Sequence, residues 1–250
     1  MNKFEAKILY IYHSGFAVET ENYFLVFDYY KEQNLIKEKS LFPSILSNDN
    51  IRDNKKVFVF CSHSHGDHFN PVILDWQKYN SDIKYVLSDD IITPTKKPNY
   101  TFMKENDEKE IDKLYVKAYG STDIGISFLI KIDGLTIFHA GDLNWWHWKE
   151  DSLEEQKLAE LNFKIQIKKL KQENTIDIAF FPVDPRLEEF YSLGGEYFAN
   201  QLHPNLIIPM HFADTPSITK EFLKKMEKIN IKSIEIKQAP QEMLFSKNEN

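Results

Sequence analysis

The stretch Val57-Phe58-Val59-Phe60-Cys61-Ser62-His63-Ser64-His65-Gly66-Asp67-His68 holds the strongest structural signal in the chain. It begins with a run of apolar side chains, which is typical of a short strand buried on both faces of a sheet. Imidazole and carboxylate groups then gather where that strand ends. Four such groups within six positions favour a catalytic metal site over an ordinary polar turn. The metal ligands expected from this stretch are His63, His65, Asp67 and His68.

Two later residues are placed in the same way. Asp142 follows an expected strand at residues 135–139, and His211 follows another at residues 206–210. Taken alone, a turn-forming aspartate and a buried core histidine would explain them. Strands that deliver metal-binding side chains at their ends can nevertheless bring them together at one sheet edge. We therefore add Asp142 and His211 to the expected ligands.

The remaining pattern predicts two sheets covered by helices rather than a simple alternating wound sheet. At 250 residues, the chain has the length of one large layered domain, residues 1–250. Residues 30–56 and most of residues 89–112 are polar and are expected to be surface loops. The expected helices are residues 71–79, 152–173, 195–202 and 219–229. The expected strands are residues 7–12, 16–19, 23–28, 57–61, 84–88, 100–103, 113–119, 125–132, 135–139, 176–183, 206–210 and 233–237.

Composition narrows the function classes. The chain has 31 basic and 38 acidic residues, and the net charge of -7 argues against a general nucleic-acid or anionic-membrane surface. No apolar run is long enough to span a membrane, and the first residues lack a signal-peptide pattern. The single cysteine, Cys61, supports neither an internal disulfide nor a thiolate-rich zinc site. We expect a cytoplasmic protein that acts on a small molecule through a metal held by histidines and carboxylates.

The motifs His63-x-His65-x-Asp67-His68, Gly141-Asp142 and His211 together resemble those of the metallo-β-lactamase-fold hydrolases, especially the ascorbate-6-phosphate lactonase-like group. The resemblance covers nearly the whole chain and implies an α/β fold, a four-layer αββα sandwich of two mixed β-sheets flanked by helices. It also implies one or two divalent transition-metal ions, with zinc expected first and manganese or iron as alternatives.

The same resemblance assigns roles to the ligands. His63 and His65 would bind one metal, Asp67, His68 and His211 would bind the other, and Asp142 would bridge the two. Asp28, which ends the third expected strand, would support the ligands from behind, as outer carboxylates usually do.

One departure from the family pattern concerns its third motif. The family places a further histidine ligand between His68 and Asp142, but the matching stretch here is Tyr119-Gly120-Ser121-Thr122-Asp123. Ser121, Asp123 or water could complete the first metal site, or only the second metal could bind tightly. Three protein ligands still suffice for a catalytic zinc.

Further candidates surround the expected ligands. His13 and His139 could donate to a substrate oxygen, and with Asp67 they form the expected catalytic group. Arg186 could hold a substrate carboxylate or phosphate, although an ion pair with a nearby carboxylate explains it as well. Trp145 could wall the substrate pocket, or it could pack in the core.

The expected reaction is attack by a metal-bound hydroxide on an ester-type bond, in a phosphodiester, a phosphorylated lactone or a similar small metabolite. Two alternatives stay open: an RNA-processing nuclease like ribonuclease Z, and a non-catalytic metal-binding or sensing protein with a degenerate first metal site. The helix expected at residues 152–173 has two apolar stripes, one at Leu158, Leu161 and Ile165. The other stripe is at Phe163, Ile167 and Leu170. Two apolar stripes suggest that the helix contacts both the sheet and a second subunit, so we expect a homo-oligomer.

Overall fold

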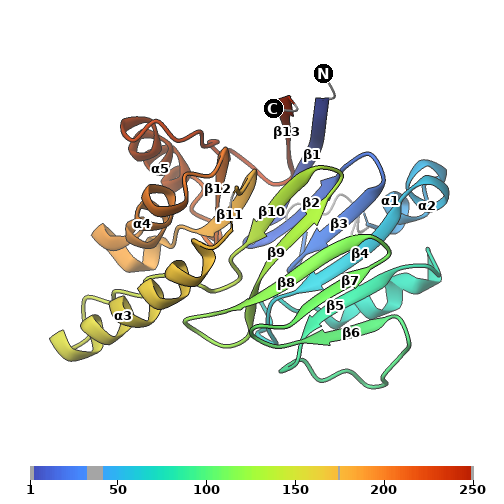
Figure 1. Ribbon diagram of the computed structural model, residues 1–250, viewed down its shortest axis with the longest axis horizontal. Helices are drawn as coiled ribbons and strands as arrows, with labels where there is room; N and C mark the ends of the chain where they lie inside the picture. Colours follow the sequence, from blue (N-terminus) through green and yellow to red (C-terminus); the bar gives the residue numbers. More distant parts are fainter. Residues whose placement is uncertain (1–2, 33–41, 174, 249–250) are drawn as a thin grey trace. The chain divides into compact units, whose positions relative to one another are not determined.

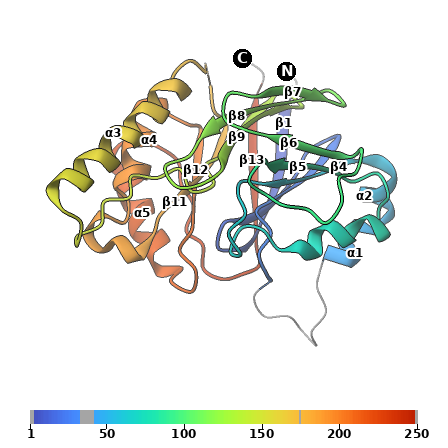
Figure 2. The same cartoon turned by 90° about the horizontal axis from the view of Figure 1, so that it is seen from below.

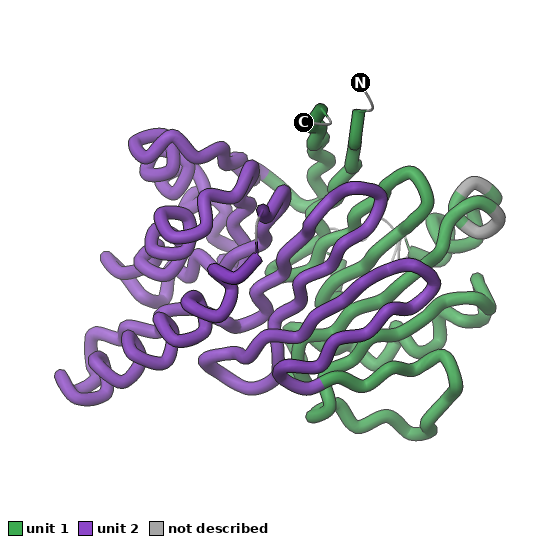
Figure 3. The backbone as a smooth tube through the Cα atoms, in the orientation of Figure 1, with its two compact units in different colours: residues 1–103, 238–250 green, residues 104–237 purple. Residues whose placement is uncertain are grey.

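The computed structural model describes residues 3–32, 42–173 and 175–248 (Figure 1). The chain forms two compact units: unit 1 comprises residues 1–103 and 238–250, and unit 2 comprises residues 104–237 (Figure 3). Each unit contains one mixed β-sheet with helices, so the expected α/β class with two mixed sheets flanked by helices is confirmed. The assignment of residues 1–250 to one domain stays a prediction.

Unit 1 is built on a seven-stranded sheet in the order β13-β1-β2-β3-β4-β5-β6. Strands β1 to β3 form an antiparallel meander, whereas β3 to β6 are parallel neighbours. The apolar run that predicted a strand buried on both faces is β4, where every side chain after the first is buried. The bounds are β1 (Lys3–Tyr12), β2 (Gly15–Glu19), β3 (Tyr23–Phe27), β4 (Lys56–Cys61), β5 (Lys84–Ser88), β6 (Tyr100–Met103) and β13 (Gln241–Asn248).

The described residues of unit 1 also form three short helices: α1 (Phe42–Leu46), α2 (Asp49–Asn54) and the 3-10 helix η2 (Pro71–Lys78). Phe42 stacks on Trp76 with the ring centroids 4.7 Å apart, so α1 belongs to the core. The expectation of a surface loop is therefore wrong for residues 42–54, where polar residues between the buried apolar ones dilute the periodicity. Residues 33–41 of that stretch lie outside the described residues.

Unit 2 contains a six-stranded sheet in the order β12-β11-β10-β9-β8-β7. Asp133 and Gly134 join β9 to β10 with φ of 42° and 71°, as the expected tight hairpin requires. Strand β7 was not expected, because it is a mostly exposed edge strand of charged residues. The bounds are β7 (Glu108–Ile111), β8 (Leu114–Gly120), β9 (Ile126–Ile132), β10 (Leu135–His139), β11 (Ile178–Pro182) and β12 (Leu206–Met210).

Helices α3 (Leu153–Leu170), α4 (Leu193–Leu202) and α5 (Ser217–Lys228) lie together beside β11 and β12 (Figure 2). The predicted capping box starts α3: Ser152 accepts a hydrogen bond from the Glu155 backbone, and the Glu155 side chain accepts one from the Ser152 backbone. The short 3-10 helix η3 (Pro185–Phe190) links β11 to α4. No helix in the described ranges is both long and apolar enough to cross a membrane.

The end of the chain differs from the expectation. Residues 233–237 form no strand; only Ser233 makes an isolated bridge, to Ile207. The Ile236 backbone N–H instead donates to Thr219 Oγ1, which ties this segment to α5. The final strand is β13, which pairs antiparallel with β1. A partner strand at the opposite end of the sequence leaves no local signal.

Candidate metal-binding site

The first set of predicted ligands lies in the loop that follows β4 in unit 1. His63 Nε2 and His65 Nδ1 are 3.1 Å apart, and the rings of His63 and His68 have centroids 4.1 Å apart. Asp67, which is half-buried, offers an oxygen within 4.8 Å of a ring nitrogen of His68. The chain turns sharply here, because the N–H groups of His68 and Phe69 both donate to the His65 carbonyl. The structure thus gathers all four predicted ligands of this loop.

Asp28 lies beneath this loop, directly after β3, and is fully buried. Its carboxylate accepts hydrogen bonds from the Ser62 backbone N–H (2.8 Å), the Ser62 hydroxyl (2.6 Å) and His68 Nδ1 (2.7 Å). Because the Ser62 hydroxyl donates to Asp28, it accepts from His63 Nδ1 at 2.9 Å. Both imidazoles therefore carry their proton on Nδ1 and keep the Nε2 lone pair for a metal.

His13 lies beside the same loop, on the turn after β1. Its Nε2 is 3.4 Å from Asp67 Oδ2, and its ring stands edge-on to His68 at 5.6 Å. The neighbouring His13 imidazole, with a smaller contribution from His68, holds the pKa of the Asp67 carboxyl well below its usual range although partial burial opposes this.

The Cys61 thiol is a structural part of the loop. It is fully buried and donates to the His68 carbonyl oxygen at 3.1 Å. Burial raises the pKa of this thiol, and the charges of Asp28 and Asp90 raise it further. The thiol therefore stays protonated near neutral pH, which removes it from the set of metal ligands.

The second set of predicted ligands lies in unit 2. Asp142 follows β10, His211 follows β12, and Asp142 Oδ1 is 3.2 Å from His211 Nε2. His211 Nδ1 donates to Asp184 Oδ2 at 3.0 Å, and Asp184 is buried two residues after β11. Burial alone would raise the pKa of the Asp184 carboxyl, but hydrogen bonds from His211 and Arg186 lower it to about 2. His211 thus also keeps Nε2 for a metal.

The two sets repeat one arrangement. In each, an aspartate after one parallel strand holds the Nδ1 of a histidine that follows the neighbouring parallel strand: Asp28 with His68 after β3 and β4, and Asp184 with His211 after β11 and β12. Three of the candidate residues have positive φ, namely His13 (58°), Asp28 (41°) and His211 (67°). Such backbone strain is concentrated at functional sites.

The donor groups in each set fit a divalent transition metal. Two ligands that bind zinc at about 2.1 Å in tetrahedral geometry lie about 3.4 Å apart. The separations of 3.1 Å between His63 and His65 and of 3.2 Å between Asp142 and His211 are close to that value. Imidazole and carboxylate donors without thiolate suit zinc, manganese or iron.

The loop that lacks the third-motif histidine lies near Asp142 in unit 2. A carboxylate oxygen of Asp123 is within 4.8 Å of one of Asp142. The Ser121 hydroxyl accepts from the Asp123 backbone N–H at 3.2 Å, so Ser121 shapes the turn. Thr122 Oγ1 donates to the Asn144 carbonyl (2.6 Å) and accepts from its N–H (2.9 Å), which fastens this loop to the segment after Asp142. The structure therefore brings the predicted candidate Asp123 next to a predicted ligand.

The other candidates of unit 2 are also placed. His139 is buried, and its Nδ1 accepts from the Gly141 N–H at 3.2 Å, which leaves the proton on Nε2. The Arg186 guanidinium contacts both carboxylate oxygens of Asp184, with Nη2 2.5 Å from Oδ2. The structure therefore shows the ion pair that was the alternative to a substrate contact for Arg186.

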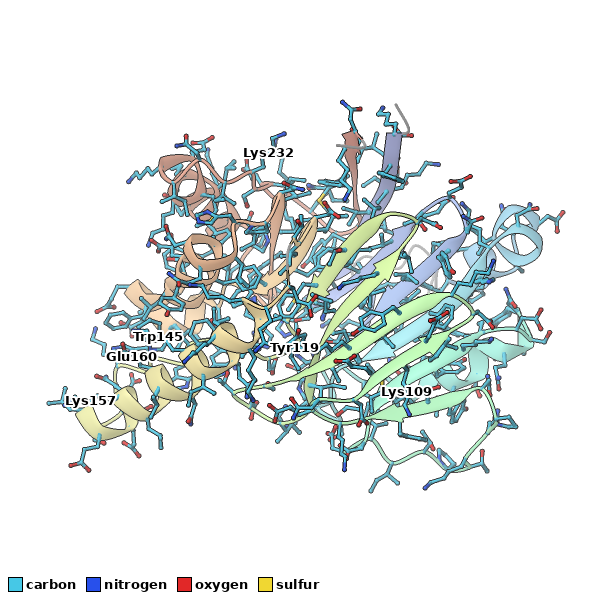
Figure 4. The ribbon with its side chains drawn as sticks, in the orientation of Figure 1. Lys109, Tyr119, Trp145, Lys157, Glu160 and Lys232 are labelled. Atoms are coloured by element: carbon cyan, nitrogen blue, oxygen red, sulfur yellow. The ribbon has the colours of Figure 1, made fainter. Side chains whose placement is uncertain are left out.

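Trp145 and Trp146 have different surroundings. The Trp145 ring lies 6.0 Å from both Phe163 and Tyr197, against α3 and α4 (Figure 4). The Trp146 ring instead stands edge-on to His211 at 5.6 Å, and its indole N–H donates to the Asp142 backbone carbonyl at 3.0 Å. The tryptophan that contacts the ligand set is thus Trp146.

Sequence reasoning missed Ser62 and Asp184 as parts of the site, and it considered Trp146 together with the neighbouring tryptophans without singling it out. Asp184 carried a usable signal, because it follows a buried strand just as Asp28 does. That signal becomes specific only when β11 is known to pair with the strand that delivers His211. Ser62 and Trp146 carried no signal that separates them from neighbouring residues of similar type.

The sequence and the fold resemble those of known proteins. Residues 7–211 match the family described as "Beta-lactamase superfamily domain". A protein of Staphylococcus carnosus (strain TM300) named "UPF0173 metal-dependent hydrolase" is 23% identical over 223 residues, which cover 80% of this chain and 86% of that protein.

Two solved structures show the same fold. Igni18, a metallo hydrolase from Ignicoccus hospitalis, superimposes with a TM-score of 0.66 at 17% identity and covers 96% of this chain and 98% of its own. The metallo-β-lactamase fold protein YhfI from Bacillus subtilis gives a TM-score of 0.62 at 12% identity, with 99% and 100% coverage.

Proposed function

The chain belongs to the β-lactamase superfamily, and we propose that it is a metal-dependent hydrolase that cleaves an ester-type bond in a small molecule. Phosphodiesters and phosphorylated lactones are the substrate classes we propose. One observation carries the proposal: His68 and His211 are each held by a buried carboxylate at Nδ1. Such anchoring fixes the tautomer and raises the basicity of a metal-binding histidine.

The metals we propose are one or two divalent transition ions, zinc first, with manganese or iron as alternatives. When bound, such an ion lowers the pKa of a coordinated water toward about 7 and polarises a carbonyl or phosphoryl oxygen. His63, His65, Asp67 and His68 of unit 1 and Asp142 and His211 of unit 2 would hold the ions. The bridging role of Asp142 stays a prediction.

Asp123 could replace the absent third-motif histidine as a metal ligand. Its carboxylate lies within 4.8 Å of the Asp142 carboxylate, and Ser121 and Thr122 hold its loop in place. Carboxylate oxygen binds zinc at nearly the same distance as imidazole nitrogen. We therefore propose Asp123, and not Ser121, as the replacement ligand.

Three residues would handle protons and orientation. His13 is the proposed donor to the leaving oxygen, because its imidazole lies beside Asp67, one of the proposed metal ligands. Asp67, ionised at neutral pH, would orient His13. His139 would donate through Nε2, the nitrogen that its bond with Gly141 leaves protonated. We also propose Arg186 and Trp145 as substrate contacts. We propose that the protein acts in the cytoplasm.

The test is turnover by chain reconstituted with zinc, manganese or iron in turn. The substrates are aryl phosphodiesters, aryl esters and lactones, with a His211→Ala variant as the metal-site control. We expect metal-dependent hydrolysis of at least one class, lost in the variant. Bound metal with no turnover of any class would favour the non-catalytic alternative, whereas turnover of RNA alone, weakening steeply with salt, would favour a nuclease.

A further inference from the structure

Helix α3 presents a row of exposed apolar side chains on the face opposite to its buried face, which packs against the rest of unit 2. Phe163, Ile167 and Leu170 are buried on the inner face. The outer face carries Leu158, Leu161 and Ile165, which are 56%, 56% and 44% exposed. Three large apolar side chains spaced by three and four residues along one helix mark a helix-packing surface.

The ends of this row carry opposite charges. Glu154 lies seven residues before Leu161 and Lys168 lies seven residues after it, so each is about 10.5 Å from the centre along the helix. Both side chains are exposed, and neither forms an ion pair with any described residue. We call Glu154, Leu158, Leu161, Ile165 and Lys168 the outer stripe of α3.

We propose that the outer stripe binds the outer stripe of a second copy of this chain, with the two helices antiparallel and a two-fold axis near Leu161. That axis places Glu154 of each copy opposite Lys168 of the other and Leu158 close to Ile165. The stripe is therefore complementary to itself, which is the property that an isologous dimer interface requires. Antiparallel packing also places the acidic first turn of α3 beside the basic last turn of its partner, so that the helix dipoles attract.

The lysine beside the stripe is turned away from it. Lys164, next to Ile165 in the sequence, forms an ion pair with Glu160 on its own helix and lies over the Trp145 ring at 4.8 Å. In Figure 4, Lys157 and Glu160 mark the outer half of α3, and Lys157 points away from the sheet. The apolar centre of the stripe is left to a partner.

The size of the contact predicts a reversible dimer. A helix of 18 residues is about 27 Å long and about 12 Å wide, so such a pair covers on the order of 300 Å² per copy. A standard stable interface takes about 800 Å² per partner. We therefore expect the dimer to dissociate on dilution through the micromolar range.

Sedimentation velocity of the full chain, from low micromolar to submillimolar concentration, tests the proposal. We expect a monomer–dimer equilibrium that Leu161→Glu shifts toward monomer by at least roughly 100-fold, because it places two carboxylates at the two-fold axis. Leu244→Glu is the matched control, since Leu244 is 78% exposed on β13 and lies off the stripe. A monomer at every concentration, or a dimer that Leu161→Glu leaves intact, overturns the proposal.

A charge exchange tests the antiparallel geometry. Glu154→Lys and Lys168→Glu should each weaken the dimer roughly tenfold, because two exposed ion pairs of ordinary strength become repulsive. Mixing the two variants, or combining both changes in one chain, should restore the parent affinity, since each Lys then faces a Glu again. Failure of both recoveries contradicts the two-fold arrangement. Circular dichroism of each variant confirms that α3 still folds.

Discussion

Replacing Asp184 by asparagine tests the idea that a buried carboxylate sets the metal affinity of unit 2. Asp184 accepts from His211 Nδ1 at 3.0 Å, from the Arg186 backbone N–H at 2.9 Å and from the Arg186 guanidinium. An amide of the same shape carries no charge and can donate to Nδ1 through its nitrogen. The imidazole proton then moves to Nε2, the nitrogen that should bind metal.

The expected size follows from the hydrogen bond between the Asp184 carboxylate and His211 Nδ1, which the substitution removes. Removing a hydrogen-bonded partner behind a metal-binding histidine typically costs 10–100-fold in metal affinity, about 1.4 to 2.8 kcal/mol. The assay is competition for zinc between the apo chain and a chromophoric chelator, at a pH near neutral. We expect Asp184→Asn to bind zinc at least roughly tenfold more weakly than the parent chain.

A matched control separates metal affinity from general damage. Asp177 is another fully buried aspartate of unit 2, but it lies directly before β11, at the end of the strand away from Asp184, and accepts from the Thr136 N–H (2.8 Å) and the Asn205 side chain (2.9 Å). Asp177→Asn should lower the melting temperature and leave zinc affinity unchanged. Equal zinc affinity in Asp184→Asn and the parent, or an equal loss in both variants, would refute the reasoning.

Four further outcomes are expected. Phe42→Ala should destabilise the chain by roughly 3–5 kcal/mol in urea unfolding, because Phe42 stacks on Trp76 in the core; a change below about 1 kcal/mol would contradict that packing. Burial raises the pKa of the Glu173 carboxyl, but the hydrogen bonds from Lys131 and Tyr119 and the charges of Lys131 and Lys117 together outweigh it, so the net pKa is lowered. Ionised Glu173 thus stabilises the fold above its unfolded pKa of about 4.3, and the stability gap between parent and Glu173→Gln should close as pH falls below that value; a gap that widens in acid would be inconsistent. His13→Ala should lower kcat by roughly 100-fold or more with metal content unchanged, and loss of metal instead would make His13 a ligand. Adding back zinc at about 100 times its dissociation constant should stabilise chelator-treated chain by about 2.7 kcal/mol in thermal unfolding, and no shift would mean that the folded state does not bind it.

The parts of the fold that sequence predicted best are those with a local cause. The apolar run of β4, the hairpin at Asp133 and Gly134, and the capping box at Ser152 each act within a few residues. The parts that were missed depend on distant partners. Strand β13 needs β1 to complete its ladder, and the burial of Phe42 depends on its ring contacts with Tyr29 and Trp76.

The same distinction holds for the candidate site. The spacing of His63, His65 and His68 in one loop predicts a metal site, because a metal needs several donors close together. Asp184 is recognised only when the parallel pairing of β11 with β12 shows which histidine lies beside it. Likewise, which of Trp145 and Trp146 contacts the ligand set depends on the direction of each side chain, and the sequence alone does not show that direction.

The most direct test of the metal-dependent hydrolase account is the metal content per chain, measured by inductively coupled plasma mass spectrometry on protein purified without chelator or histidine tag. His63→Ala, Asp123→Ala and His211→Ala would be measured beside the parent chain. The account predicts one or two equivalents of a divalent transition metal in the parent and fewer in each variant. A parent chain that binds none, even after zinc, manganese or iron is added, would contradict it.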